Sequence, residues 1–575
     1  MNFRKKNHID GYAIVSVLMI LSVVFVVAVA AVNVISTDSG FSVADEHSKE
    51  AFYIAEAGLN AAFTEFKNSN SSGFTHDTNG NSIPTHAYDR LPITLPDTVS
   101  AADGWNQWTW NPGSSMKSFT DTGKMEQFRY MVKPVGANGW SITAESTLGD
   151  SLTGFKKRVV MAGTIKSAFN YFYFSNSDLS EFVRGDSQTI AGMIFANGNL
   201  FIRPSGSTLQ ISAVRGPGGV VTSPGTLQSA QKIIRNTDAW GRPYGGGTVN
   251  IEPANSNTVA PPSVTMTGSS TPEQSFDSNN QLWADPNQGA MKKWGGWVKD
   301  GALGVQRQEP PTFKSFDDKG YYYQQAQKGG LLVTSASSGT GISSGVRFYN
   351  AAEAREETAV QLDMSKIIYP PNGLIYANTP VRIINASKLK APVSIVSNST
   401  IYTKGDYNNN NPVSSALMTV ARTYHLSDGF NDKDSYKSSI PKASVSSGNT
   451  QQINACMVDG PPTVTEINYV KSWNGIRNPL YNPVDQPNGK YCWANSDNLL
   501  EDWSGKTLKK RGAIIHINST TMAKLDNSDA GPGVVAWIMD THYGVPIRDY
   551  AYDSTIVNPP FIPKIIQRTY WAQEK

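Results

Sequence analysis

An uncharged apolar stretch near the N-terminus constrains this chain more than any other feature. No side chain from Tyr12 to Ser36 carries a charge. Because a helix rises ~1.5 Å per residue, about 20 apolar residues cross the hydrocarbon core of a bilayer. Residues 12–36 therefore predict a transmembrane helix. The basic residues Arg4, Lys5 and Lys6 keep the short leader in the cytoplasm, so the bulk of the chain is expected to be exported.

Three kinds of N-terminal segment fit this stretch. A secretory signal would be cut after a small-x-small triplet such as Ala28-Val29-Ala30, a plain anchor would stay uncut, and a third type would be cut on the cytoplasmic side, after Gly11. The following residues favour the third. Apolar side chains recur there at three- and four-residue spacing, at Phe52, Ala55, Leu59, Ala62, Phe63 and Phe66. The helix is thus expected to continue to residue 68 in amphipathic form, which a secretory signal has no reason to do.

The N-terminal residues carry a family resemblance. Gly11-Tyr12 before the apolar stretch, and the string Ala51-Phe52-Tyr53-Ile54-Ala55-Glu56-Ala57-Gly58-Leu59, resemble the PilX N-terminal family of pilin-like proteins of type IV pilus systems. The resemblance implies a prepilin leader over residues 1–11, cleavage between Gly11 and Tyr12 by a prepilin peptidase, and methylation of Tyr12. It also implies a pilin helix over 12–68 that lies in the membrane first and then binds other pilins.

Ser16 departs from the pattern of major pilins, which carry Glu at this fifth mature position. In the family that carboxylate is thought to pair with the terminal amine of the neighbouring subunit, since an unpaired ammonium among apolar helices is costly. A subunit that lacks the carboxylate suits a filament tip, as in the GspK-type pseudopilin of type II secretion.

Residues 69–166 are expected to form a pilin-like head. Three strand-like runs, 127–135, 140–147 and 156–165, are separated by Gly-containing turns, which predicts an antiparallel sheet. Three tryptophans precede them and form either part of the head core or an exposed ligand platform: Trp105, Trp108 and Trp110.

The large region 167–575 has the composition of a β-rich domain. Short β-branched runs end at Asn, Gly or Pro, as in 189–202, 373–383, 391–397 and 399–403. The later runs recur about every ten residues with no helix between them, which predicts partial parallel β-solenoid character. A β-sandwich with long insertions is the alternative, and residues 204–330 are expected to hold long loops. With the N-terminal helix, the predicted fold class is α+β.

Several of these blocks also resemble a domain of unknown function found in large PilX-type proteins. They are YFYFSNS, IAGMIFANGNLFI, GLIYANTPVRI, VSIVSNSTIYTKGDY and the C-terminal 550–553 and 558–563. This resemblance implies no chemistry.

Two further features of the large domain have open interpretations. Trp294 and Trp297 lie in a Trp-Gly-Gly-Trp motif among lysines and form either a ligand platform or a buried loop plug. Cys456 and Cys492 are the only cysteines, and an even number in an exported protein predicts one disulfide; two free buried thiols are the alternative.

Metal and enzyme chemistry are not expected. Residues 77–81 alternate oxygen ligands as a calcium loop does, but no acidic residue closes the loop, so an ordinary turn is favoured and calcium stays the alternative. Residues 406–411 predict a polar turn. The motif 149–152 matches GDSL esterases, yet it lies in a predicted hairpin turn, and 540–542 is one residue short of their Asp-x-x-His. A polysaccharide-active enzyme would need clustered carboxylates, which 373–403 does not offer.

Charge excludes nucleic acid as an expected partner. The formal net charge is +3, and Arg4, Lys5, Lys6 and Asp10 together contribute +2 of it. The rest of the chain is close to neutral and offers no electrostatic footprint for a phosphate backbone.

The sequence therefore predicts a non-catalytic minor pilin or pilin-like subunit without a cofactor. It would act in pilus assembly, at the filament tip or in low copy, after a single-pass inner-membrane stage. A surface adhesin carried on the pilus and a pseudopilin of a type II secretion system are the alternatives.

Overall fold

The structure of the protein is a computed structural model. It describes residues 10–68, 74–76, 82–84, 93–94, 106–110, 126–135, 139–148, 155–182, 188–202, 208–215, 220–223, 225–235, 248–251, 264–266, 277–350, 355–436, 441–446, 448–460, 499–503, 505–517 and 546–574.

The chain divides into two compact units. The first, named the head unit here, comprises Met1–Glu65, Phe74–Gly163 and Thr569–Lys575. The second, the body unit, comprises Phe66–Gly73 and Thr164–Arg568. Along the sequence, the long segment of the body unit is therefore inserted between two segments of the head unit.

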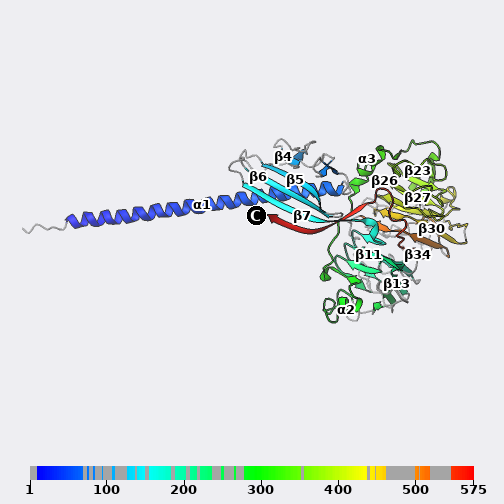
Figure 1. The fold of residues 1–575 in the computed structure, drawn as a ribbon, viewed down its shortest axis with the longest axis horizontal. Helices are drawn as coiled ribbons and strands as arrows, with labels where there is room; N and C mark the ends of the chain where they lie inside the picture. The colour runs from blue at the N-terminus through cyan, green and yellow to red at the C-terminus, as the bar shows by residue number, and fades with distance from the viewer. Residues whose placement is uncertain are drawn as a thin grey trace, which may run out of the picture. The chain divides into compact units, whose positions relative to one another are not determined.

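Helix α1 (Asp10–Asn68) is one uninterrupted helix of 59 residues, drawn in blue in Figure 1. At 1.5 Å per residue it is about 90 Å long. It covers all of the predicted helix 12–68, and Gly40 and Gly58 lie within it without ending it. The helix ends at Asn68, where the sequence turns to Ser, Asn and Gly, which favour turns over helix.

An eight-stranded sheet belongs with this helix. Its main path runs β1-β2-β5-β6-β7-β35, and β4 pairs with β3 and β5. The predicted strands 127–135, 140–147 and 156–165 fall within β5, β6 and β7 and are confirmed. Strands β5 and β6 pair antiparallel from Glu126↔Leu148 to Val135↔Gly139. The strands are β1 (Phe74–His76), β2 (Ser82–Pro84), β3 (Ile93–Thr94), β4 (Asn106–Trp110), β5 (Glu126–Val135), β6 (Gly139–Leu148), β7 (Phe155–Ser167) and β35 (Lys564–Glu574).

The second half of α1 packs on this sheet through small and aromatic side chains. Ala51, Ala55 and Leu59 are fully buried, and the ring of Phe63 lies 5.5 Å from the ring of Trp140 on β6. Small side chains let the helix backbone approach the sheet closely enough for the Ser146 hydroxyl to donate to the Ala51 carbonyl. The apolar face predicted from the three- and four-residue spacing is therefore confirmed for this part of the helix.

The body unit is built mainly from parallel strands. Its largest sheet has ten strands, and every neighbouring pair in it is parallel. Many of these strands are buried along their whole length, as β24 and β26 are, because both faces of the sheet are covered. In spatial order the strands are β20 (Val298–Lys299), β16 (Thr226–Ser229), β11 (Met193–Ala196), β8 (Tyr173–Ser175), β33 (Ile514–His516), β31 (Cys456–Asp459), β28 (Ser415–Thr419), β26 (Val393–Ser397), β24 (Leu374–Ala377) and β21 (Leu331–Val333).

Four further sheets complete the body unit. Their pairs are parallel except β18–β19, β22–β23 and β14–β15. The seven-stranded sheet consists of β19 (Val264–Met266), β18 (Thr248–Ile251), β13 (Thr208–Ser212), β10 (Gln188–Ala191), β34 (Ile547–Ala551), β32 (Thr507–Arg511) and β30 (Thr450–Asn454). The five-stranded sheet consists of β22 (Ile342–Asn350), β23 (Arg355–Asp363), β25 (Val381–Ile384), β27 (Ile401–Lys404) and β29 (Thr423–Leu426). A three-stranded sheet contains β17 (Ile233–Arg235), β12 (Leu200–Ile202) and β9 (Leu179–Phe182), and a two-stranded sheet pairs β14 (Val214–Arg215) with β15 (Val221–Ser223).

Strand order in the ten-stranded sheet differs from chain order. The chain enters at β8, in the middle, and adds β11, β16 and β20 toward one edge. It resumes at β21 on the opposite edge and adds β24, β26, β28, β31 and β33 until β33 pairs with β8. The closing contact joins Tyr173 and His516, which are 343 residues apart in the chain. Such a sheet needs long-range pairing before it can close.

Hydroxyl side chains hold the turns at the ends of these strands. Ser175, Ser229, Ser397 and Thr419 each accept a hydrogen bond from the backbone N–H two residues further along. Ser397 and Thr419 are also directly paired across the ladder. The side chain replaces the ladder hydrogen bond that a continuing strand would make, so each strand stops after a few residues.

The described parts of residues 204–330, where long loops were expected, contain short strands and helices. Strands β13, β16 and β18, helix α2 (Ala290–Trp294) and helix α3 (Tyr321–Gln327) all lie in this range of the sequence. The strands are only a few residues long and are separated by Gly- and Pro-rich segments, so composition averaged over the range hides them. The short 3-10 turns of the body unit are η1 (Ala168–Asn170), η4 (Gly301–Leu303), η5 (Phe313–Ser315) and η6 (Asp434–Tyr436).

Candidate functional site

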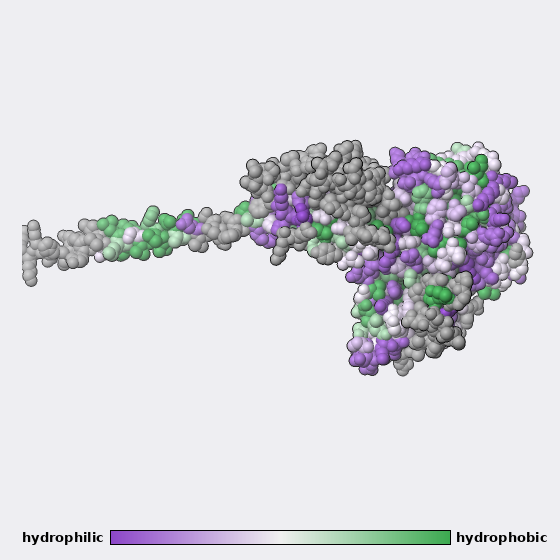
Figure 2. Space-filling view, viewed as in Figure 1, coloured by the Kyte–Doolittle hydropathy of each residue, from purple (hydrophilic) through white to green (hydrophobic). Residues whose placement is uncertain are grey.

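The first half of α1 exposes an apolar surface. In the part of the chain that the structure describes, one helical segment, Ser16–Asn33, is long and apolar enough to cross a membrane, and none of it is buried within the protein. Phe25 is 70% exposed, and the helix surface is green, hence hydrophobic, in this region of Figure 2. Apolar area left in water is unfavourable, so lipid or other apolar helices around this surface would stabilise it.

The predicted cleavage site lies at the start of this helix. Gly11 and Tyr12 fall in the first turn of α1, which begins at Asp10, and the structure describes their backbone only. Ser16 lies at the first position of the membrane-length segment and is exposed. Cleavage and methylation stay predictions.

The tryptophan platform around residue 294 is not formed. Trp294 is only 4% exposed, and its ring lies 5.7 Å from that of the buried Trp283. Trp297 is half-buried and packs against the same core. The buried-plug alternative is therefore correct for Trp294, because its large apolar ring gains more by burial than by exposure. Trp108 and Trp110 lie in β4, but their side chains, and all of Trp105, fall outside the described residues.

Cys456 lies in β31 and is fully buried, with its Sγ atom 3.9 Å from the carbonyl oxygen of Ile556. It forms no disulfide with a described residue, and burial raises the pKa of its thiol. Cys492 lies outside the described residues, so the predicted disulfide stays a prediction.

Neither metal candidate gains support. No group of three or more His, Cys, Asp or Glu side chains suited to a metal ion occurs among the described residues. Asp406 instead accepts hydrogen bonds from the Gln452 backbone N–H at 2.8 Å and from the Asn409 amide at 2.7 Å. This pattern agrees with the polar turn predicted over 406–411. The calcium candidate 77–81 and the segments 149–152 and 540–542 lie outside the described residues.

The body interior holds ionisable side chains that bind one another and the backbone. Asp459 accepts hydrogen bonds from the Thr423 backbone N–H and hydroxyl, at 3.1 and 2.7 Å. Glu501 accepts two bonds of 2.6 Å from the backbone and hydroxyl of Ser427. Burial raises the pKa of Asp459 to about 6 and that of Glu501 to about 7. Both carboxylates hold neighbouring chain segments together.

His516 is a third buried ionisable group. Its Nε2 atom lies 2.6 Å from the Tyr173 hydroxyl, across the closing strand pair β8–β33. Burial lowers the pKa of His516 to about 4, so the imidazole is neutral near pH 7 and shares a hydrogen bond with the Tyr173 hydroxyl. The hydrogen bond to Tyr173 satisfies one ring nitrogen of the buried His516, which is consistent with a structural role for this side chain.

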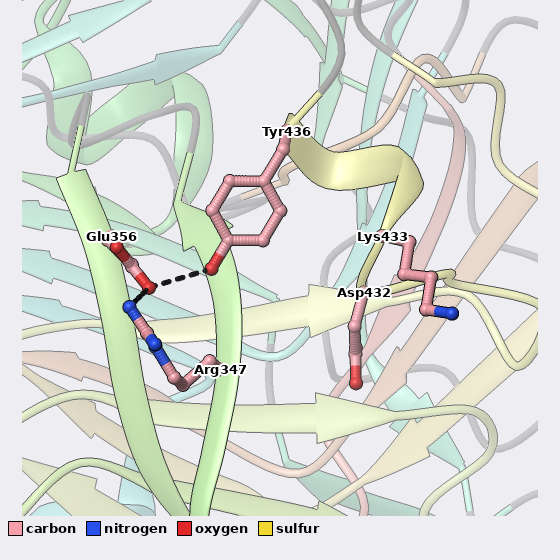
Figure 3. A pocket seen from close by; sticks show the side chains of 5 residues that line it. All are labelled: Arg347, Glu356, Asp432, Lys433 and Tyr436. Atoms are coloured by element: carbon pink, nitrogen blue, oxygen red, sulfur yellow. Dashed lines mark hydrogen bonds and ion pairs between the residues drawn. The ribbon is translucent and has the colours of Figure 1, made fainter.

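A shallow, open pocket of about 500 Å³ lies on the surface of the body unit. Two cationic, two acidic and one aromatic side chain line it, and Figure 3 shows them around a common space: Arg347, Glu356, Asp432, Lys433 and Tyr436. Arg347 lies on β22 and Glu356 on β23, whereas the other three belong to the segment that ends with η6.

Glu356 links the strand pair β22–β23 to the segment that ends with η6. Its Oε1 atom forms an ion pair with the Arg347 guanidinium and accepts a hydrogen bond of 3.1 Å from the Tyr436 hydroxyl. Partial burial and the neighbouring Glu356 carboxylate raise the pKa of Tyr436, so its hydroxyl stays protonated and continues to donate. The hydroxyl is thereby fixed, while the Tyr436 side chain stays 47% exposed.

A buried arginine orients the opposite wall. Arg382, only 5% exposed, donates from Nη1 to Asp432 at 2.5 Å. Its Nε and Nη2 atoms both donate to the Gln361 side-chain oxygen, at 3.1 and 2.7 Å, and its guanidinium lies 5.5 Å from the centre of the Phe348 ring. Because all of these contacts hold the guanidinium, the Asp432 carboxylate has one defined position.

A serine holds the segment that carries Asp432 and Tyr436. The Ser435 hydroxyl donates to the Asp432 carbonyl at 2.5 Å and accepts from the Tyr349 backbone N–H at 2.8 Å. The ring of Tyr436 lies 6.0 Å from the ring of Tyr349 on β22. These contacts hold the segment that ends with η6 against β22.

The sequence analysis identified none of the pocket residues. Arg347 and Glu356 face each other only because β22 and β23 pair, and Tyr436 is 80 residues from Glu356 in the chain. The local signal was the charged run from 432 to 434, followed by Tyr436, an aromatic residue among polar neighbours.

Comparisons with known proteins give little guidance. No protein-family model matches the chain, and no curated protein matches it. Among solved structures, the crystal structure of the competence-associated pilin ComZ from Thermus thermophilus is similar, with 11% sequence identity over 92% of this chain and 97% of that chain, at a TM-score of 0.22. A likeness at this score decides neither the fold nor the function of this chain.

Proposed function

We propose that the chain is a non-catalytic minor pilin or pilin-like subunit of a type IV pilus-type filament, which acts in pilus assembly at the tip or in low copy. The observation that carries the proposal is the contrast within α1. One half, Ser16–Asn33, exposes its apolar side chains, and the other half packs on an antiparallel sheet. A subunit that moves from a bilayer into a helical bundle needs a helix of this kind.

The proposal includes partial parallel β-solenoid character for the body unit. From β24 to β29 successive strands alternate between two sheets, and each strand pairs in parallel with the strand two places later. This is the connectivity of a chain that winds in successive coils. The hydroxyl-capped turns after Ser397 and Thr419 support it, since equivalent corners recur from one coil to the next.

Tip or low-copy placement rests on two features. Ser16 stands where major pilins carry Glu, and the insertion of the body unit between two head segments makes the exported part large. A bulky body on every subunit would crowd a helical shaft. A pseudopilin of a type II secretion system has the same requirements for its helix and is the alternative.

Processing at Gly11 tests the proposal. In cells that contain a prepilin peptidase, Gly11→Ala is expected to block removal of the leader, visible as slower gel migration of the full chain. Gly40→Ala, a glycine change within the same helix, is the matched control and should be processed like the wild type.

Mass spectrometry of the mature N-terminus completes this test. A methylated Tyr12 is the expected terminus. A mature chain that begins near residue 31 would identify a secretory signal and would refute the filament proposal.

A further inference from the structure

We infer that the pocket lined by Arg347, Glu356, Asp432, Lys433 and Tyr436 binds a neutral carbohydrate, by stacking a sugar ring on Tyr436 and bonding its hydroxyls to the charged side chains. This goes beyond the filament proposal and holds whether or not the chain enters a filament. The pocket's volume of about 500 Å³ lies within the range of small-molecule sites.

The balance of charge selects the ligand class. Two cations and two carboxylates line the pocket, so an anionic ligand meets carboxylates and a cationic ligand meets a guanidinium and an ammonium. The lining offers a single aromatic side chain, Tyr436, beside these charged groups. A neutral molecule with many hydroxyl groups fits best, because each hydroxyl both donates and accepts.

The positions of the groups match a sugar ring. In Figure 3, the Tyr436 ring and the Arg347 guanidinium lie on one side of the pocket and the Asp432 carboxylate on the other, with the Lys433 side chain beyond Asp432. A pyranose has an apolar face of C–H groups, which suits the exposed Tyr436 ring, and a rim of hydroxyls, which suits a carboxylate and an ammonium. Lys433 lines the pocket and its side chain is exposed.

Fixed side-chain positions distinguish this pocket from an ordinary depression between exposed charged residues. Exposed ion pairs usually contribute little and hold no fixed geometry. Here Asp432 is held from beneath by Arg382, and η6 is held by Ser435. Binding therefore requires little ordering of side chains, which lowers its entropic cost.

Saturation-transfer NMR on the full-length chain tests the inference. The chain is kept in a zwitterionic detergent without a sugar headgroup, and the probes are glucose, galactose, mannose, N-acetylglucosamine, cellobiose, lactose and diacetylchitobiose. At least one probe is expected to show transfer concentrated on the ring C–H protons of one face. Absence of transfer to every probe overturns the inference.

Variants localise the binding. Tyr436→Ala and Asp432→Asn should each weaken the affinity about tenfold, while Tyr436→Phe keeps the ring and should lose less. Tyr53→Ala removes an exposed tyrosine from α1 and is the matched control, with unchanged affinity expected. Equal binding by wild type and Tyr436→Ala overturns the inference, and circular dichroism melting of each variant identifies any loss of folding. Leader processing at Gly11 is read separately, so either proposal can fail alone.

Discussion

The first half of α1 and the interior of the body unit depart from ordinary burial in opposite directions. In the helix, apolar side chains such as Leu18 and Phe25 are exposed. In the body, ionisable side chains such as Asp459, Glu501 and His516 are buried. The buried groups find hydrogen-bond partners inside the chain, at Thr423, Ser427 and Tyr173. The exposed apolar groups are not covered by any part of the chain that the structure describes, so apolar surroundings outside the chain would stabilise them.

The largest expected effect comes from placing charge on the helix. Val24→Asp combined with Val27→Asp puts two carboxylates in the middle of the Ser16–Asn33 segment. Each Asp near the centre of a membrane helix disfavours insertion by about 3 kcal/mol, so the pair is expected to disfavour it by about 6 kcal/mol. The fraction of the chain that stays in the membrane pellet after alkaline extraction measures this.

Val43→Asp is the matched control for this pair. Val43 is an exposed valine of the same helix but lies outside the membrane-length segment, so membrane retention should be unchanged. If the double variant stays in the membrane pellet to the same extent as the wild type, the exposed half of α1 does not hold the chain in the membrane. The contrast between this helix and the body interior would then be wrong.

The same chemical change should have different effects in the two regions. Phe174→Ala removes a fully buried ring that stacks on Phe195 at 5.5 Å, and is expected to lower the free energy of unfolding by about 3–5 kcal/mol. Phe25→Ala removes an exposed ring and should leave the unfolding of the β-rich units unchanged. Urea unfolding of the full chain in detergent micelles, followed by tryptophan fluorescence, measures both. Equal losses would contradict the contrast.

The pH dependence of stability tests the role of the buried ionisable side chains in the body unit. Burial raises the pKa of Glu501 from 4.5 to about 7, so between these values the folded state binds a proton that the unfolded state has released. The contribution of Glu501 is therefore fully present below about pH 4.5 and is lost as pH rises to about 7, with a total on the order of 3 kcal/mol. His516 acts in the opposite sense: its pKa falls from 6.5 to about 4, so its contribution is lost as pH falls through that range.

Glu501→Gln isolates the carboxylate. Thermal melts at about pH 5 and about pH 8 should show a smaller loss of stability with rising pH in this variant than in wild type. Ser427→Ala removes a hydroxyl that donates to Glu501 and favours its ionised form, so it should deepen the loss. Parallel profiles for wild type and Glu501→Gln would show that the buried carboxylate does not influence folding.

The sequence was sufficient wherever the signal is local. Helix α1 follows from an uncharged stretch continued by the spacing of Ala55, Leu59 and Ala62, and β5, β6 and β7 follow from β-branched runs between glycine turns. In each case the neighbours that fix the conformation lie within a few residues along the chain. The tryptophan at 294 was ambiguous because its lysine neighbours, Lys292 and Lys293, are exposed on the same short helix that buries it.

The pairing of strands in the body unit could not be predicted from the sequence. Tyr173–Ser175 and Ile514–His516 are both three-residue strands, and nothing in their composition selects one as the partner of the other. The pocket has the same origin. Its charged side chains are ordinary surface residues in the sequence and form a site only after β22, β23 and η6 are brought together.

By itself the sequence determined that this chain begins with a helix suited to apolar surroundings and continues as a β-rich protein, since hydrophobic periodicity acts over a few residues. Only the tertiary structure decided that β33, the last strand of the ten-stranded sheet in the sequence, pairs with β8, the first. It also decided that Trp294 is buried and that five polar side chains share a pocket. Those outcomes depend on which distant segments meet, and that is set by the packing of the whole interior.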